Sequence, residues 1–355
     1  MESFSTMPPR IALRAWVLLL LATALPASLT AQGNTANDGA KKTAKETAPP
    51  KRKPPIRASM VGYIDDALVG SQVRIRADAA IGDTQPDLAE FFQAQAGYDA
   101  TQGNFGTPAG PGPGLAIKEN FQQLYMRGEY APMGRLSFVV DVPVRWVQPI
   151  LFAAGTTTNG QWGNQAGLSD VSAGFKVAAQ QSESDAVTFQ FLATFPSGDA
   201  SKALGTAHYA IAPAILYYQK LTDRVALESE ISDSHPIGAD TAGFAGDVLE
   251  YGAGPSFVAY NGARVKFAPV VEFVGWKIFG GEWSDSQNID PQDPNFNPKS
   301  GPSLDSADGH IINLKGGFRT TIGNNTSIYA GYGHALTNAN LWYNEIFRFE
   351  FRRTF

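Results

Sequence analysis

The sequence predicts an all-β fold: a transmembrane antiparallel up-and-down β-barrel of about twelve strands, after a signal peptide and a disordered N-terminal tail. Three observations predict it. The C-terminal run alternates between phenylalanine and charge, the N-terminus has the layout of a secretory leader, and the connections between the alternating segments are in turn long and short. A membrane barrel accounts for all three.

The C-terminal run has a period of two. Its aromatic and charged residues fall on opposite parities, namely Phe347, Phe349, Phe351 and Phe355 against Arg348, Glu350 and Arg352. On a strand, this alternation puts rings on one face and charges on the other, so we expect lipid against the rings. We expect Phe351 and Phe355 to form an assembly signal read by the barrel-assembly machinery. Arg353 breaks the pattern, because it has the lipid-facing parity and must reach headgroups from the interface.

The N-terminus predicts export. Arg10 and Arg14 precede an apolar stretch that runs to Leu25, and small residues follow through Ala31, which is typical of a cleaved signal peptide over residues 1–31. An N-terminal membrane anchor is the alternative, but the apolar stretch is shorter than the roughly 20 residues that a spanning helix needs. Residues 32–69, rich in lysine and proline, are expected to be a flexible periplasmic tail, and 70–355 the barrel. The absence of cysteine excludes disulfides and thiolate metal sites.

From residue 70 onward, segments of alternating apolar and polar residues are separated by turn residues. We expect strands near 71–81, 119–130, 135–146, 168–179, 187–195, 209–217, 224–231, 249–257, 265–273, 312–319, 326–336 and 347–355. Long connections such as 280–308 alternate with short turns such as Asn261-Gly262, a strong hairpin signal. Short periplasmic turns and longer outer loops are typical of outer-membrane barrels, with a soluble β-sandwich as the alternative.

Four prolines resist this interpretation, because Pro143, Pro213, Pro255 and Pro269 fall inside expected strands. Each removes a donor from a hydrogen-bond ladder, and a closed barrel has no edge strand to accommodate it. Bulges in the ladder would absorb them.

The polar parity of the strands predicts which side chains line the lumen. These candidates carry both signs of charge and are Arg74, Arg76, Asp141, Arg145, Lys176, Glu228, Glu230, Lys266, Glu272, Arg319, Arg348 and Glu350. If opposed rows pair with each other, they fill the interior and narrow the pore. If they line separate walls, they create a transverse field that orients polar solutes. Because barrels of about twelve strands lie between filled small barrels and open porins, both arrangements stay open.

The sequence gives no sign of catalysis. None of the four histidines has a partner at metal-ligand spacing or lies in a serine-hydrolase elbow, so we expect no catalytic residue, no metal and no cofactor. The acidic segment 280–308 matches no calcium loop and is expected to be a solvated surface loop. A formal net charge of -5 without a basic patch argues against a nucleic-acid partner.

Three short motifs carry a family resemblance. Gly167-Leu168-Ser169-Asp170, Phe195-Pro196-Ser197-Gly198-Asp199 and Leu204-Gly205-Thr206 resemble the pattern of an outer-membrane family labelled transporter, or MetA-pathway of phenol degradation. The resemblance spans roughly residues 167–355. It implies an outer-membrane barrel that admits small aromatic or other hydrophobic compounds.

Two functional hypotheses follow from these observations. The first is an outer-membrane channel that passively admits a small solute, with membrane lipid, the assembly machinery and the solute as its partners. The alternative is a non-conducting structural or surface-binding barrel whose long outer loops bind a partner. Conductance in planar bilayers discriminates between them.

Overall fold

The structure is a computed structural model that describes residues 59–83, 116–152, 158, 161–206, 208–237, 247–279, 310–337 and 345–355. The expected signal peptide, residues 32–58 of the expected tail and the acidic segment 280–308 lie outside these ranges. In the described part of the chain, no helix is long and apolar enough to cross a membrane.

The fold is all-β, and twelve long strands form a closed antiparallel barrel, as the sequence predicts. The long strands are β1 (Gln72–Asp83), β2 (Ala116–Met133), β3 (Leu136–Phe152), β5 (Val171–Gln181), β6 (Asp185–Phe195), β7 (Tyr209–Lys220), β8 (Val225–Ile237), β9 (Asp247–Phe257), β11 (Val265–Phe279), β12 (His310–Ile322), β13 (Thr326–Thr337) and β14 (Glu345–Thr354). Two short strands, β4 (Gln165–Leu168) and β10 (Tyr260–Asn261), add to β3 and β11.

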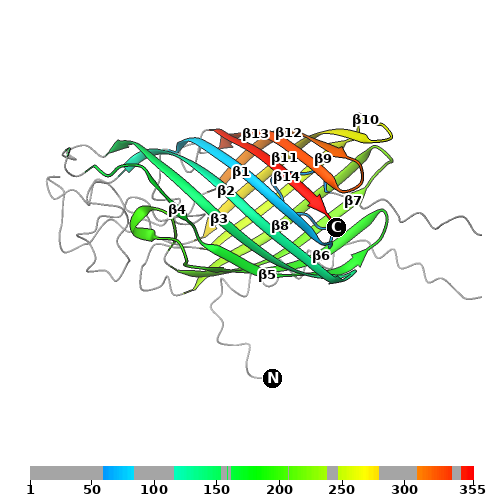
Figure 1. Ribbon diagram of the computed structural model, residues 1–355, viewed down its shortest axis with the longest axis horizontal. Helices are drawn as coiled ribbons and strands as arrows, with labels where there is room; N and C mark the ends of the chain where they lie inside the picture. Colours follow the sequence, from blue (N-terminus) through cyan, green and yellow to red (C-terminus); the bar gives the residue numbers. More distant parts are fainter. Residues whose placement is uncertain are drawn as a thin grey trace, which may run out of the picture. The chain divides into compact units, whose positions relative to one another are not determined.

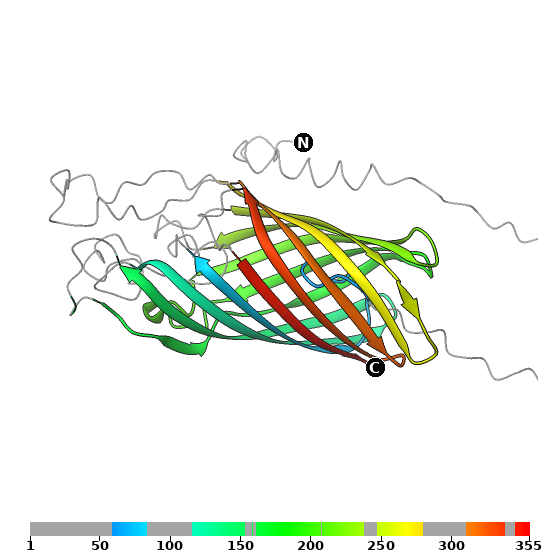
Figure 2. The ribbon, with the colours of Figure 1, turned by 90° about the horizontal axis from the view of Figure 1, so that it is seen from above.

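The barrel closes between its first and last strands. β1 pairs with β14 from Gln72 opposite Thr354 to Ile81 opposite Glu345, and Figure 1 shows the two strands side by side. Neighbours along the chain pair in turn around the rest of the sheet. The short turns between strands lie at the same end as the C-terminus, which Figure 2 shows beside the turn that joins β12 to β13. In barrels of this kind the short-turn end faces the periplasm.

Each of the four prolines lies where a ladder is interrupted. Pro143 lies where β3 changes partner from β4 to β5, and Pro269 where β11 changes partner from β10 to β9. At Pro213 the β7–β8 ladder skips two residues, and at Pro255 the β9–β11 ladder does the same. The missing donors therefore coincide with irregularities in pairing, which reconciles these prolines with a closed barrel.

The two faces of the sheet have opposite chemistry. Large apolar side chains point outward along the strands, and Phe138, Phe273 and Phe349 keep about half of their surface exposed, at 52%, 50% and 52%. The largest fully buried side chains include Arg145 and Arg319, which face inward. Charge inside and aromatic rings outside are the inverse of a soluble protein, and they match a barrel whose exterior meets lipid. The protein is an integral outer-membrane β-barrel.

This inversion gives a first prediction. Val140 points outward from β3, between Gly128 of β2 and Ala173 of β5, whereas its neighbour Asp141 points inward and binds Arg127. We expect Val140→Arg to cost about 2–4 kcal/mol, the cost of a cation facing lipid at mid-depth. The loss is measured as a smaller folded fraction in heat-modifiability gels. Tyr130→Arg is the control, because Tyr130 is exposed near the short-turn end, and equal losses in both variants would contradict the assigned faces.

Candidate functional site

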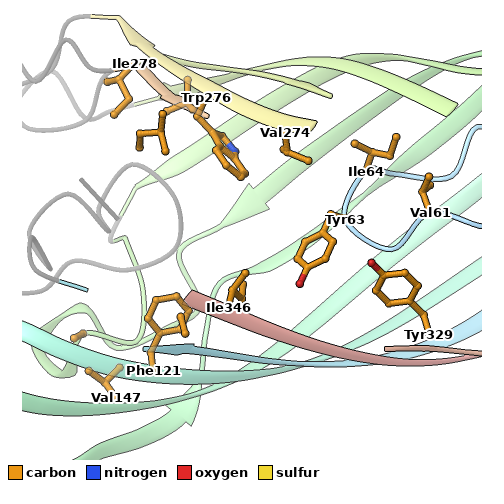
Figure 3. Packing of buried hydrophobic residues seen from close by; sticks show 14 of the residues in the cluster. Val61, Tyr63, Ile64, Phe121, Val147, Val274, Trp276, Ile278, Tyr329 and Ile346 are labelled. Atoms are coloured by element: carbon orange, nitrogen blue, oxygen red, sulfur yellow. The ribbon is translucent and has the colours of Figure 1, made fainter. Parts of the chain in front are cut away.

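The lumen is filled by the segment that precedes β1, residues Ser59–Gly70, here called the plug. It has no regular secondary structure, yet nearly all of its residues are buried among inward-facing side chains of the barrel. Figure 3 shows Val61, Tyr63 and Ile64 on this segment inside the barrel. The sequence predicts residues 59–69 to be part of the flexible tail. The structure corrects that boundary, because these residues pack into the lumen.

Glutamates of the barrel wall bind the plug backbone. The amide N–H groups of Met60 and Val61 donate to Glu228, at N···Oε1 distances of 2.8 and 3.4 Å. Those of the next three residues, 62–64, donate to Glu272 at 2.8 to 3.1 Å, and that of Asp65 donates to Glu230 at 2.6 Å. Buried N–H groups without a helix or sheet need such acceptors. Three wall carboxylates thus replace the ladder that the plug lacks.

Donors of the wall bind the plug carbonyls. Arg319 donates to the carbonyls of residues 60 and 61 at 3.0 and 2.6 Å, and Arg348 donates to that of Gly62 at 2.7 Å. Nearer to β1, Lys176 donates to the carbonyl of Asp66 at 2.8 Å, and Thr188 to that of Ala67 at 2.5 Å. The wall therefore recognises the main chain of the plug on both its donor and its acceptor side.

Two plug carboxylates meet cations of the wall. Asp65 accepts from Arg127 at 2.7 Å, from Arg74 at 3.2 Å and from the Gln190 amide at 2.9 Å. The next residue, Asp66, forms an ion pair with Arg352 at 3.0 Å. Charge-assisted bonds of this kind are about twice as strong as neutral ones.

Apolar packing completes the fit of the plug. The Tyr63 ring meets the Tyr329 ring edge to face, with centroids 6.1 Å apart, and the Lys315 ammonium lies 4.0 Å from the Tyr63 centroid. Glycines of the wall leave room for plug side chains: a Cβ at Gly252 would lie 2.5 Å from Cγ2 of Ile64, and one at Gly254 would lie 2.7 Å from Cγ1 of Val61.

The structure places the lumen candidates in three groups. Those that contact the plug directly are Arg74, Lys176, Glu228, Glu230, Glu272, Arg319 and Arg348. Arg76, Asp141, Arg145 and Glu350 contact other wall residues: Arg76 lies over the Tyr125 ring, Asp141 pairs with Arg127, Arg145 lies over the Phe121 ring, and Glu350 pairs with Arg319. Lys266 lines a cavity at the short-turn end. The opposed charges pair between nearby strands of the wall, or with the plug, so charges of both signs lie side by side.

That cavity is a vestibule of about 980 Å³ beneath the plug. Met60 and Gly70, near the two ends of the plug, both line it, together with short-turn residues such as Glu183 and Asp223. The plug is therefore a loop that enters the lumen from the short-turn end and returns to the same end.

The lumen is lined by more apolar residues near the long-loop end than around the plug. Most of the buried inward-facing residues at that end are apolar, and they form what we call the apolar belt: Ala80, Phe121, Val147, Val248, Trp276, Ile278, Ile311 and Ile346. The buried carboxylates of Asp83 and Glu119 lie at the same end of β1 and β2. Figure 3 shows Phe121, Trp276 and Ile346 from different strands of this belt. A path from the long-loop end thus passes the apolar belt, with the Arg145–Glu119 pair beside it, before it reaches the charged wall around the plug.

The three motifs of the family resemblance converge at the outer end of β5 and β6. Asp170 accepts from the Gly198 amide at 2.9 Å and from both the amide and the hydroxyl of Thr206 at 2.7 Å. A Cβ at Gly205 would lie 2.6 Å from Oδ1 of Asp170. Their spacing in sequence therefore reflects a tightly packed connection around the η4 helix (Ala200–Lys202), and not a catalytic group.

The proposed assembly residues point outward at the end of the barrel. Phe351 on β14 and the terminal Phe355 are both exposed, and the amide of Phe355 donates to the Ser71 carbonyl at 3.0 Å. Arg353 lies at the same end, where it donates to Thr326 at 3.1 Å. The reading of this strand by the assembly machinery stays a prediction. The absence of a catalytic residue also stays a prediction. Among the described residues, no cluster of three metal-ligating side chains occurs.

Sequence reasoning missed Asp65, Arg127 and Tyr329 as site residues. Its error was to treat residues 59–69 as a continuation of the lysine- and proline-rich tail. A signal was present, because residues 59–70 hold Met60, Val61, Tyr63 and Ile64 but no lysine or proline. Such apolar content favours a buried segment over a disordered one.

Comparisons with known proteins show only broad similarity. No family model matches the chain, and no curated protein matches its sequence. Among solved structures, an outer membrane channel from Pseudomonas putida F1 is 12% identical, with a TM-score of 0.47 over 81% of this chain and 96% of that one. The NanC porin is 6% identical (TM-score 0.41; 80% and 98% covered), and TodX, a monoaromatic hydrocarbon channel, is 8% identical (TM-score 0.40; 81% and 91%). At these values, the likenesses carry no argument about family or function.

Proposed function

We propose that the protein is a passive outer-membrane channel for a small solute with an apolar, for example aromatic, body, and that the plug closes it. The observation that carries this proposal is how the plug is held. Side chains of the wall bind its backbone, whereas no strand pairing joins it to the barrel. Side-chain contacts of this kind can exchange for water without breaking the sheet.

Some ion pairs of the barrel wall do not involve the plug. Arg348 binds Asp78 with two bonds of 2.7 and 2.6 Å, and Arg127 binds Asp141 at 3.0 Å. These pairs join neighbouring strands and stay intact when the plug leaves. The lumen would then be a water-accessible passage with paired charges on its wall, in the space that residues 59–70 now occupy.

The apolar belt supports the proposal that the solute has an apolar body. Pockets for small organic molecules are mostly apolar, with a few polar groups that fix orientation. A solute that enters from the long-loop end would leave water at the belt and reach the charged wall next.

The test is a deletion of residues 59–69 that retains the signal peptide and the rest of the tail. We expect the deleted barrel to fold and to conduct in planar bilayers at least tenfold more than the intact protein, because the lumen loses its occupant. A deletion of equal length within the tail, residues 33–43, is the matched control and should leave conductance unchanged. A heat-modifiable but non-conducting barrel after deletion of residues 59–69 would refute the channel and favour the structural or surface-binding alternative.

A further inference from the structure

The Asp65 carboxylate occupies a ready-made anion receptor. Its donors are Arg74 on β1, Arg127 on β2 and Gln190 on β6, at 3.2, 2.7 and 2.9 Å. Glu230, also close by, accepts from the Asp65 amide and not from its side chain. Recognition of the carboxylate therefore belongs to two guanidinium groups and one amide, a donor set suited to a carboxylate.

The receptor is anchored independently of the plug. The Arg127 Nε donates to Asp141 at 3.0 Å, so one edge of this guanidinium is fixed by the wall while the other faces Asp65. Arg74 lies 3.7 Å from Glu350, another wall residue. If the plug leaves, the donors keep their positions, and the cationic site faces the lumen without its carboxylate.

The site also lies on the route that the proposed channel offers. On β2, Phe121 of the apolar belt lies six residues from Arg127 toward the long-loop end, and on β1, Ala80 lies six residues from Arg74 in the same direction. Apolar residues on the long-loop side of a pair of arginines, with the Arg76–Asp78 pair between them on β1, are complementary to a small organic acid with an apolar body.

Resting on the proposed channel function, we propose that the Arg74–Arg127–Gln190 site binds the carboxylate of a small apolar organic acid. Asp65 is then the resident occupant of that site. Such a solute and the plug compete for the same donors, so the solute promotes the opening of its own path. The chemical class is that of benzoate: one carboxylate on a compact apolar body.

The experiment uses the full-length protein with one added cysteine. Ala67→Cys puts a thiol on a plug residue that is 1% exposed, and the native chain contains no cysteine. The rate of maleimide labelling then reports how often the plug leaves the lumen. We expect sodium benzoate to accelerate labelling at least fivefold in a saturable manner. Benzamide, its neutral counterpart of similar shape, and sodium chloride at equal ionic strength should not.

Variants of the wall test the site itself. Gln190→Leu removes one donor to Asp65, and Arg127→Gln removes another; in both backgrounds the benzoate effect should disappear. Arg352→Gln is the matched control, because it loses the contact with Asp66 but keeps the Asp65 site, so benzoate should still accelerate labelling. If Arg127→Gln fails to fold, Gln190→Leu decides the question.

The outcomes separate this proposal from the channel function. Equal acceleration by benzamide or by sodium chloride, no acceleration at all, or a benzoate effect that survives Gln190→Leu would overturn the carboxylate site. Direct binding of benzoate to the barrel without residues 59–69, measured by calorimetry, should be detectable. If that barrel conducts but does not bind benzoate, the channel stands and the site fails. If it binds benzoate but does not conduct, the site stands and the channel fails.

Discussion

Replacing Glu272 with glutamine is expected to release the plug while leaving the barrel folded. The Glu272 carboxylate accepts three consecutive amide N–H groups of the plug, at 2.9, 2.8 and 3.1 Å. In glutamine an NH2 group replaces one of the two carboxylate oxygens. This NH2 donor would then face the amide N–H donors of the plug. Because a hydrogen bond to a charged group contributes about 1.5–3 kcal/mol, losing two should shift the plug equilibrium by about a hundredfold or more.

Maleimide labelling of the Ala67→Cys protein measures this shift, and heat-modifiable mobility confirms that the barrel is intact. Glu345→Gln provides the control. Glu272 on β11 accepts from the Tyr329 hydroxyl at 3.2 Å, and Glu345 on β14 likewise accepts from the Tyr332 hydroxyl at 3.4 Å, but no plug contact involves Glu345. Equal labelling rates in Glu272→Gln and the parent protein would show that the glutamate contacts do not hold the plug.

Replacing Glu350 with leucine should destabilise the barrel itself. Its carboxylate lies 2.9 Å from Arg319, 3.0 Å from Arg352 and 3.7 Å from Arg74, and its side chain is fully buried. Leucine fills a similar volume but leaves these guanidinium groups without their shared partner. Removing one partner of a buried ion pair typically costs about 3–5 kcal/mol.

The cost should appear as a lower urea midpoint for loss of the heat-modifiable form. Asp223→Ala is the comparison, because Asp223 pairs with Lys220 at 2.6 Å but is almost fully exposed, and solvent screens such pairs. We expect no measurable shift in that variant. A shift of similar size in both would mean that the Glu350 cluster contributes no more than an ordinary surface pair.

The barrel could be predicted from the sequence because its pattern is local. Outward and inward parity repeat every two residues, so Phe349 and Glu350 are sorted by their immediate neighbours alone. The partner of each inward charge could not be predicted, because it depends on the stagger between strands and on the plug. Arg352, for example, meets Asp66, a residue 286 positions away in the chain.

The plug was missed for a related physical reason. Its backbone hydrogen bonds go to side chains such as Glu228 and Glu272, 167 to 210 residues further along the chain, so it shows no periodicity of its own.

Parity also could not tell that Lys266 lies in the vestibule, because parity gives a face and not a depth. The same limit applies to the ladder interruptions at the prolines, which only the pairing of neighbouring strands reveals.

The position of the plug in the chain has a consequence for biogenesis. The plug precedes β1 and is made before every strand, yet many of its partners lie on β8, β11, β12 and β14, the last of which closes the barrel. Contacts so distant in sequence form late, because the intervening chain must be ordered first. Both ends of the plug open to the vestibule, so it can enter a barrel that is already closed, without threading. If the plug enters last, each newly made molecule passes through an open barrel in the membrane, and the speed of plug entry sets how long that leak lasts.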